Sequence, residues 1–337
     1  MIEVTTLGSV DVQAGTEPER TGRGFASVPD LVAGWWPVAS SGEVVNRPVP
    51  IRLAATSLAL YRDAEGNAHA VLDRCPHRRM PLSLGRITDD GLIQCGYHGW
   101  SFDGEGGCLR IPNLRPDEQT SKRVFVDAYA VSEADGLILV HSRGKARSPL
   151  PPLLGKEPLT RTEGGQVEVR SPHSAVVAAL VLNPGAALGL GPLLGSGDEV
   201  VGPEITEAPG RISVVRERLV LNSPRVTTFD PVIKRAIRVR IEVDPGTGLT
   251  LVTAERERDS EIRCLIAATP MTPYRTVVRW QLRVTGTGAR AVLLAAASGW
   301  ALRHRAGRTA SAFETAADGT DSIRDPALEL LTSTGKE

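Results

Sequence analysis

The chain has 337 residues with 39 basic and 39 acidic side chains, so its formal net charge at neutral pH is zero. Acids and bases are interspersed, which excludes the basic face of a nucleic-acid-binding protein and a polybasic membrane-binding patch. The length is sufficient for two domains, each with its own core. We therefore expect neither nucleic acid nor a membrane as a partner.

The first half of the chain predicts a small antiparallel β-domain. The first twenty residues lack the basic segment and apolar core of a signal peptide. We expect residues 1–30 to form a loosely ordered arm. From Leu31 the pattern becomes strand-like, and two short apolar runs on either side of residues 65–67 are typical of a β-hairpin. The β-domain is expected to span residues 31–145. A stretch rich in proline, glycine and basic residues predicts a linker at 146–158.

The second half predicts an antiparallel sheet with helices, which makes the whole chain an α+β protein. Residues 234–244 alternate between apolar and charged side chains, as in a strand with one buried face, and Pro245–Gly248 predicts the turn that follows. We expect a helix at Ala289–Leu302, a second domain spanning residues 159–320 and a frayed polar tail at 321–337. The concave face of such a sheet can hold a small apolar ligand.

One segment of the second half, Ala175–Gly195, is nearly uncharged over about the length of a membrane span. Asn183, Pro184 and Pro192 interrupt it, which disfavours a spanning helix. We expect it to be apolar packing inside the second domain.

The segment from Cys75 to Phe102 carries two Cys–His pairs, Cys75-x-His77 and Cys95-x-x-His98, with seventeen residues between the pairs. Two thiolates and two imidazoles that arrive in pairs from two loops indicate a metal site. Structural zinc accepts two Cys and two His ligands, but paired zinc ligands are usually separated by two or more residues. A Rieske [2Fe–2S] centre takes one Cys and one His from each of two loops, with the cysteines on one iron and the histidines on the other. The spacing favours the Rieske centre, with zinc as the alternative.

Three segments resemble, in the same order, the Rieske domain of the large (alpha) subunits of Rieske non-haem iron oxygenases: LYRDAEGNAHAVLDRCPHRRMPLSLG, CGYHGWSFDGEGGCLRIP and EADGLILV. The chain is most similar to the members with a single type of subunit, which hydroxylate or demethylate small organic molecules. The resemblance covers residues 31–302. It implies a second domain of the helix-grip (START-like) fold, a ring-shaped trimer, a ferredoxin or reductase as electron donor, and a small apolar substrate.

The family also implies a mononuclear Fe(II) held by two histidines and one carboxylate. The family's histidines lie in a D-x-x-H-x4-H segment, and the corresponding stretch here reads LVLNPGAALGLGPLLG. Asn183 stands at the Asp position, while Ala186 and Gly191 stand where the two histidines belong. Since neither has a side-chain donor, the comparison predicts a vacated iron site, no bound Fe(II) and no catalytic residue in this chain.

The distribution of histidines leaves one alternative iron site open. Beyond His98 no two histidines lie closer than 32 residues, so no local His pair exists downstream. A rebuilt site would need His173 and His304 from distant elements, with Asp198 or Glu314 as the carboxylate. Isolated histidines are more often surface or hydrogen-bonded residues than metal ligands.

The cysteine content of the chain indicates the redox state of the cellular compartment in which the protein works. Rieske proteins of respiratory complexes carry an additional cysteine on each cluster loop, and these two cysteines form a disulfide. Met80 and Tyr97 stand at those places here, which favours a reducing compartment and hence a cytoplasmic protein. We expect Cys108 and Cys264 to be small buried side chains.

Three functional hypotheses follow. The first is a subunit without its own mononuclear iron that passes electrons to, or scaffolds, a competent homologous subunit oxidising a small apolar molecule. The second is a stand-alone oxygenase with an unconventional iron site, or one whose chemistry occurs at the cluster alone. The third is a non-catalytic electron-transfer or redox-sensing protein. Arg78 and Arg79, next to the cluster ligands, are either a docking site for an acidic ferredoxin or simply solvated charges.

Overall fold

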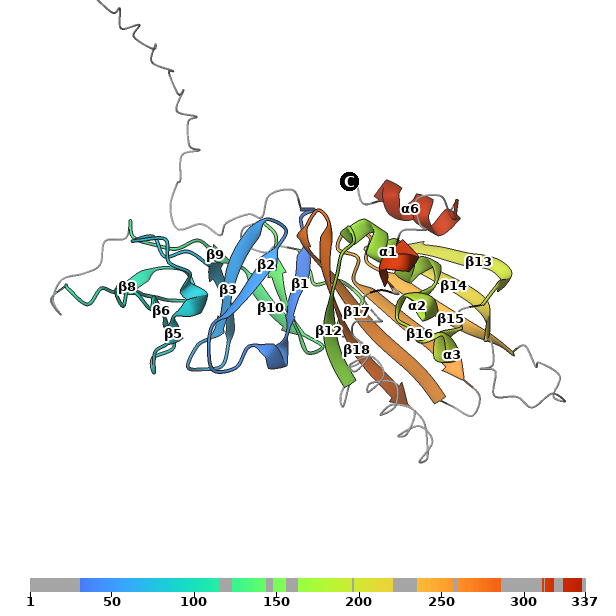
Figure 1. The fold of residues 1–337 in the computed structure, drawn as a ribbon, viewed down its shortest axis with the longest axis horizontal. Coiled ribbons are helices and arrows are strands. Elements are labelled where there is room, and N and C mark those ends of the chain that lie inside the picture. Colours follow the sequence, from blue (N-terminus) through green and yellow to red (C-terminus); the bar gives the residue numbers. More distant parts are fainter. Residues whose placement is uncertain are drawn as a thin grey trace, which may run out of the picture.

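The computed structural model describes residues 31–114, 123–143, 148–155, 163–195, 197–220, 235–256, 260–285, 311, 313–317 and 324–334. Three small antiparallel sheets of the first half lie at one end of the long axis, and a seven-stranded antiparallel sheet with helices lies at the other (Figure 1). The predicted α+β class, a small β-domain followed by a larger sheet with helices, is confirmed. The N-terminal arm and the helix predicted at Ala289–Leu302 lie outside the described residues.

Two of the small sheets form the body of the first half. One has the order β2-β3-β4-β9 and comprises Val49–Leu53, Thr56–Arg62, Ala68–Leu72 and Ala128–Tyr129. The other has the order β1-β11-β10 and comprises Trp35–Ser40, Leu137–His141 and Val131–Ala134. A short 3-10 helix, η1, follows β1 at Ser41–Glu43. The predicted hairpin is the β3–β4 pair, whose last ladder partners are Arg62 and Ala68.

Strand β3 is buried on both faces and separates two cores. Leu58 and Leu60 face a core shared with β1 and β11, whereas Ala59 and Tyr61 face a core that contains Cys75. Successive side chains on a strand point to opposite sides, so one strand can serve both cores.

The third small sheet carries the loops with the Cys–His pairs. It has the order β5-β6-β7-β8 and comprises Arg86–Ile87, Ile93–Gln94, Ser101–Phe102 and Cys108–Arg110. The 3-10 helix η2, Leu82–Leu84, precedes β5.

The second half is built on one large sheet. Its strands are β12 Glu163–Val169, β18 Arg275–Thr285, β17 Ser260–Thr272, β16 Thr250–Arg256, β15 Arg235–Val243, β14 Arg211–Val220 and β13 Glu199–Ala208, in this spatial order. The alternation predicted for residues 234–244 is confirmed, because Ile237, Val239, Ile241 and Val243 are buried in one core.

Three helices lie against one face of this sheet (Figure 1): α1 His173–Leu182, α2 Pro184–Ala187 and α3 Gly191–Leu194. They account for the apolar segment Ala175–Gly195, whose Val176, Leu180 and Leu194 join the sheet core. Each fully buried Val or Leu side chain contributes roughly 1.5–3 kcal/mol. No helix in the described parts of the chain is long and apolar enough to cross a membrane.

The prediction of a frayed tail is wrong for Pro326–Thr334, which form helix α6. Ala327 is buried in the sheet core, and Leu328 and Leu331 pack against it. Residues three and four positions apart share one face of a helix, so these apolar side chains form a packing stripe in an otherwise polar segment.

Side chains and backbone of the two halves meet directly. The Thr269 hydroxyl donates to the Pro37 carbonyl at 2.5 Å, and the Ala54 amide donates to the Pro270 carbonyl at 2.6 Å. The limits of the two domains stay a prediction, because 144–147 and 156–162 are among the residues not described.

His173 is a half-buried histidine at the first turn of α1. Its Nε2 lies 3.0 Å from the Thr247 carbonyl oxygen, and its ring meets that of Trp36 edge-on at 5.3 Å. Burial lowers the pKa of His173 to about 4, while hydrogen bonds to the backbone of Thr247 and Ala268 oppose this shift. The fold therefore holds the neutral imidazole.

This burial predicts a pH-dependent stability. Because the folded-state pKa lies below the unfolded value of 6.5, the neutral His173 contributes stability above pH 6.5 that is lost as the pH falls towards 4. We expect the melting temperature of wild type to fall more steeply between pH 7.5 and 5.5 than that of His173→Gln, which keeps a donor but does not titrate. At pH 5.5 the difference amounts to about 1 kcal/mol. Parallel pH profiles of the two proteins would contradict the buried neutral state.

Candidate metal centre

The two loops with the Cys–His pairs fold in the same way. In the first loop, the Cys75 amide donates to the Met80 carbonyl at 2.8 Å and the Arg79 amide donates to the Cys75 carbonyl at 2.8 Å. In the second, the Cys95 amide donates to the Trp100 carbonyl at 2.9 Å and the Gly99 amide donates to the Cys95 carbonyl at 3.1 Å. Each loop thus reverses tightly just after its cysteine.

The tight reversal requires a left-handed residue four positions after each cysteine. Gly99 has a φ of 69°, and Arg79 has a φ of 60° at the equivalent place. Glycine adopts this conformation without steric cost, whereas a side chain makes it unfavourable. The first loop therefore holds Arg79 in a strained backbone geometry next to the ligand candidates.

The two thiols are buried side by side. Cys75 and Cys95 are 2% and 3% exposed and belong to the core that also contains Leu82 and Phe102. Burial raises the pKa of Cys75 to about 11, and its hydrogen bond and charge interaction with Cys95 act in the same direction. A thiol such as that of Cys75 does not ionise readily without a cation to balance the thiolate.

The two imidazoles lie side by side at the surface. The ring centroids of His77 and His98 are 4.7 Å apart, and both residues are exposed. His77 is stacked on Trp100, with centroids 4.6 Å apart and planes 4° apart, and Tyr97 lies against His98 at 3.8 Å. Tyr97 is itself 60% exposed. The aromatic rings fix the imidazoles while leaving them accessible.

Polar contacts tie down the ends of both loops. Asp73 accepts hydrogen bonds from the Ser83 amide at 2.7 Å and the Ser83 hydroxyl at 2.6 Å. The Gln94 amide group donates to the Gly99 carbonyl at 3.2 Å, and Arg86 Nε donates to Gln94 Oε1 at 2.7 Å. Such supporting contacts orient ligands before a metal binds.

This donor set fits a Rieske cluster. Its two buried thiols and two exposed imidazoles match a cluster in which two cysteines hold one iron and two histidines hold the other. No group of three or more His, Cys, Asp or Glu side chains in the described chain is arranged around a single metal position. A Rieske cluster does not need three protein ligands around one metal, because each of its irons takes only two. We retain Cys75, His77, Cys95 and His98 as the proposed ligands.

Two further predictions concern the cysteines outside the loops and the two arginines beside His77. None of the four cysteines forms a disulfide, and Cys108 and Cys264 are buried as expected, with pKa values raised to about 11 and about 12 by burial. Arg78 and Arg79 are both exposed, which is compatible with docking and with simple solvation.

The stretch aligned with the family's iron motif consists of helix ends and caps. Asn183 ends α1 and begins α2, where its Oδ1 accepts a hydrogen bond from the Ala186 amide at 3.0 Å. Gly191 is the first residue of α3. Asn183 thus acts as a helix N-cap, the role in which an Asn side chain is strongly preferred.

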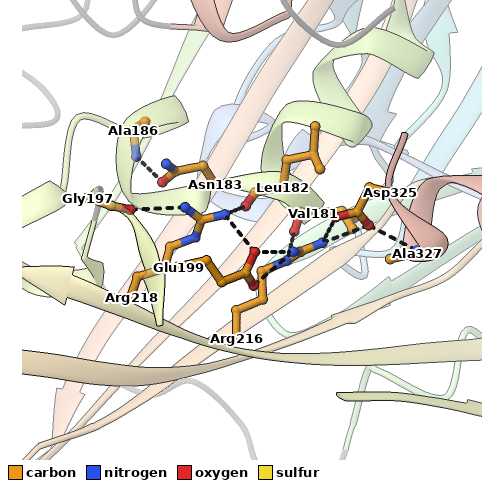
Figure 2. A network of polar contacts seen from close by, with 10 residues as sticks. All are labelled: Val181, Leu182, Asn183, Ala186, Gly197, Glu199, Arg216, Arg218, Asp325 and Ala327. Carbon is orange, nitrogen blue, oxygen red and sulfur yellow. Dashed lines mark hydrogen bonds and ion pairs between the residues drawn. The ribbon is translucent and has the colours of Figure 1, made fainter. Parts of the chain in front are cut away.

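Next to this stretch lies a network of charges that sequence reasoning missed (Figure 2). Arg216 is 1% exposed and donates to the Val181 carbonyl at 2.9 Å. Its other nitrogens pair with both oxygens of Glu199, at 3.0 and 3.1 Å, and with both oxygens of Asp325, each at 2.9 Å. Arg218 donates to the Leu182 carbonyl at 2.6 Å. Glu199 and Asp325 are therefore both engaged by the guanidinium group that also binds the end of α1.

One signal in the sequence could have indicated this network. Ile212 and Val214 alternate onto the core-facing side of β14, and Arg216 and Arg218 continue that spacing of two. Charged side chains at core-facing positions of a strand need buried partners. Their partners lie far along the chain and could not be named from the spacing.

The alternative iron site is not assembled among the described residues. His173 is hydrogen-bonded to Thr247, and Glu314 accepts a hydrogen bond from the Arg170 amide at 3.0 Å. Asp198 is exposed, and no group of three potential ligands includes any of these side chains in the described part. His304 lies outside the described residues.

Sequence comparison places a known domain over the cluster loops. The family model "Rieske [2Fe-2S] domain" matches residues 34–130. Over 134 residues the chain is 37% identical to pheophorbide a oxygenase of Oryza sativa subsp. japonica, covering 36% of this chain and 25% of that protein. Over 124 residues it is 35% identical to the oxygenase subunit of 3-chlorobenzoate-3,4-dioxygenase of Comamonas testosteroni, covering 36% and 28%. The matching stretch thus spans only about a quarter of these relatives' length.

Structural comparison extends the similarity to the second half. A crystal structure of dicamba monooxygenase bound to dicamba matches with a TM-score of 0.70 and 19% identity, covering 92% of this chain and 97% of that one. The Pseudomonas putida CBB5 protein NdmA matches with a TM-score of 0.63 and 15% identity, covering 90% and 88%. At these identities the comparison establishes the shared fold of both halves.

The cluster assignment predicts a sharp difference among the four cysteines. We expect Cys75→Ser and Cys95→Ser to lose bound iron and the visible absorption of the cluster, because one iron would lose half of its protein ligands. Cys108→Ser and Cys264→Ser are matched controls that are buried but not proposed as ligands, and they should keep both. Iron and sulfide analysis of the four purified variants checks this. Full iron content in Cys75→Ser would contradict the assignment.

The Arg216 network predicts a large difference between two arginines on neighbouring strands. Arg216→Met leaves Asp325 without its guanidinium partner and leaves Glu199 with Arg218 alone, at 3.7 Å, and breaking such a buried pair costs about 3–5 kcal/mol. Arg238 pairs with Glu204 at 3.0 Å on the exposed face, with both side chains more than half exposed. Arg238→Met should therefore cost at most about 1 kcal/mol. Urea unfolding of both variants measures the two costs, and equal costs would contradict a structural role of the network.

Proposed function

The chain is a Rieske protein with the fold of Rieske non-haem iron oxygenase alpha subunits, and from this premise we propose that it is an electron-transferring subunit without its own mononuclear iron. It would pass electrons to, or scaffold, a homologous subunit that binds iron and oxidises a small apolar molecule. When bound, a Rieske cluster takes up and gives back one electron at a time.

The observation that carries the proposal is the contrast between the two sites. All four proposed cluster ligands are present, with the thiols buried together and the imidazoles together at the surface. In the second half, Asn183 is used as a helix cap, and Ala186 and Gly191 have no donor atoms in their side chains. A mononuclear ferrous site needs two histidines and a carboxylate, and this donor set does not fit it.

The charges around Asn183 do not offer a site for a divalent cation. Arg216 and Arg218 bind the carbonyl groups of Val181 and Leu182, immediately before Asn183. The two carboxylates of the network, Glu199 and Asp325, already balance these guanidinium groups, so no excess negative charge is left to bind a metal ion. Positive side chains are favourable at this end of α1 because the helix dipole is negative there. The polar groups at the C-terminal end of α1 are thus satisfied by Arg216 and Arg218 without a bound iron.

The exposed edge of the cluster site supports electron transfer to another protein. His98 and Tyr97 are exposed at one edge, beside His77. In the proposed assembly, a ring-shaped trimer, this edge faces the iron-binding segment of a homologous subunit. Arg78 and Arg79 would attract an acidic ferredoxin or reductase to the same side. We further propose that the assembly is located in the cytoplasm.

A stand-alone oxygenase is less well supported. It would have to free His173 from its hydrogen bond to the Thr247 carbonyl and recruit further ligands across the sheet. Removing that hydrogen-bonded ring from the core leaves buried backbone carbonyls unsatisfied, which costs about 1–3 kcal/mol each.

Metal analysis tests the proposal on the purified chain. We expect two irons and two sulfides per chain, a Rieske-type EPR spectrum after reduction, and no further ferrous iron. A third iron per chain with turnover of a substrate would overturn the proposal.

Co-expression with a homologous chain that carries an intact D-x-x-H-x4-H segment tests the role in an assembly. We expect a mixed oligomer whose activity falls when His98 of this chain is replaced by Ala. Retained activity after His98→Ala would assign this chain a scaffolding role, and the absence of a mixed oligomer would favour an independent electron-transfer protein. Arg52→Ala, an exposed change on β2, serves as the control.

A further inference from the structure

A cavity of about 820 Å³ lies where the first half, α1 and α6 meet. Its walls come from six parts of the chain: residues near Trp36, the β2–β3 turn at Ala54, the first turn of α1, the turn at 245–248, the turn at 270–273, and α6. Small-molecule sites typically enclose 300–1,000 Å³ and often lie between domains. The cavity has the size and position of a ligand site.

The cavity lies at the opposite end of α1 from the vacated iron position. His173, Ser174 and Ala175 of the first turn line it, whereas Asn183 follows the last residue of the helix. A helix of 10 residues, at a rise of about 1.5 Å per residue, separates the two places by roughly 15 Å. A ligand here would not occupy the position of the missing iron.

Hydrogen bonds hold the walls in place. The Trp36 indole donates to the Val32 carbonyl at 3.2 Å, and His173 is bonded to Thr247. The Ala54 amide donates to the Pro270 carbonyl, which joins the two turns that line one side. Walls that are already ordered lower the entropic cost of binding.

Helix α6 forms the wall that carries a charge. Leu328, Glu329, Leu331 and Thr332 line the cavity, and Leu328 and Leu331 also pack against the sheet core. The position of this helix is fixed by Asp325, which pairs with Arg216 and accepts a hydrogen bond from the Ala327 amide at 2.9 Å.

The lining combines an apolar surface with one acid. Among the described lining residues, Glu329 is the only Asp, Glu, Lys or Arg, and no described residue forms an ion pair with it. His173 is neutral at physiological pH because burial lowers its pKa to about 4. The N-terminus of α1 contributes about half a positive charge, which is less than the full charge of a carboxylate. The cavity therefore favours a cation over an anion.

We propose that this cavity binds a small apolar molecule with one cationic head group, the apolar body lying between Trp36, α1 and α6 and the head group at Glu329. The proposal is independent of the electron-transfer role. Apolar contact supplies most of the affinity, and Glu329, which is solvent-exposed, supplies selectivity among head groups.

Three probes with one apolar body and different head groups test the proposal: 1-adamantylammonium, 1-adamantanol and 1-adamantanecarboxylate. Calorimetric titration of the full, cluster-loaded chain should give binding in the order ammonium, alcohol, carboxylate. We expect the ammonium to bind about three- to tenfold more tightly than the alcohol. Equal or tighter binding of the carboxylate, or no binding of any probe at millimolar concentration, would overturn the proposal.

Two variants and a control locate the site. Glu329→Gln should remove the ammonium preference while leaving the affinity for the alcohol unchanged, whereas Ala178→Phe should fill the cavity and weaken all three probes. Glu65→Gln, at an exposed turn of the first half, should change neither. Iron content and melting temperature establish that each variant is folded. An ammonium preference that persists in Glu329→Gln would overturn the assignment of the head-group position.

Discussion

The second half of the molecule depends on Arg216, a buried cation that joins three separate elements. It binds the end of α1 through Val181, the start of β13 through Glu199, and the residue before α6 through Asp325 (Figure 2). A buried charge is tolerated only when it is paired and hydrogen-bonded, so none of these contacts is dispensable. The same contacts fix α6 as a cavity wall and engage two carboxylates near the aligned iron motif.

The cluster site could be predicted from the sequence because its determinants are local. Cys75, His77, Cys95 and His98 lie on two short loops of one small sheet, and their spacing alone separates a Rieske site from most zinc sites. The β3–β4 hairpin that precedes the first loop also follows from its two apolar runs and the turn between them. The strained backbone of Arg79 could not be foreseen, because the sequence has an ordinary side chain where the other loop has glycine.

The missed features of the second half depend on contacts between distant residues. Arg216 lies 17 positions from Glu199 and 109 positions from Asp325, so no window of sequence contains the whole interaction. Without it, the segment after Asp325 looks like a polar tail. With it, the first turn of α6 is held against the sheet, and a weak apolar stripe becomes sufficient for a helix. Tertiary contacts of this kind commonly override local propensity.

The two halves use their polar side chains in opposite ways, and this difference bears most directly on function. In the first half, both imidazoles remain exposed and ready to bind metal, and the two thiols lie next to each other. In the second half, His173, Asn183 and Arg216 already satisfy backbone groups or carboxylates within the core. Binding a metal there would first require breaking hydrogen bonds that the fold uses, whereas the cluster loops require no such exchange. This difference in cost favours the cluster loops over the end of α1 as a place for a metal.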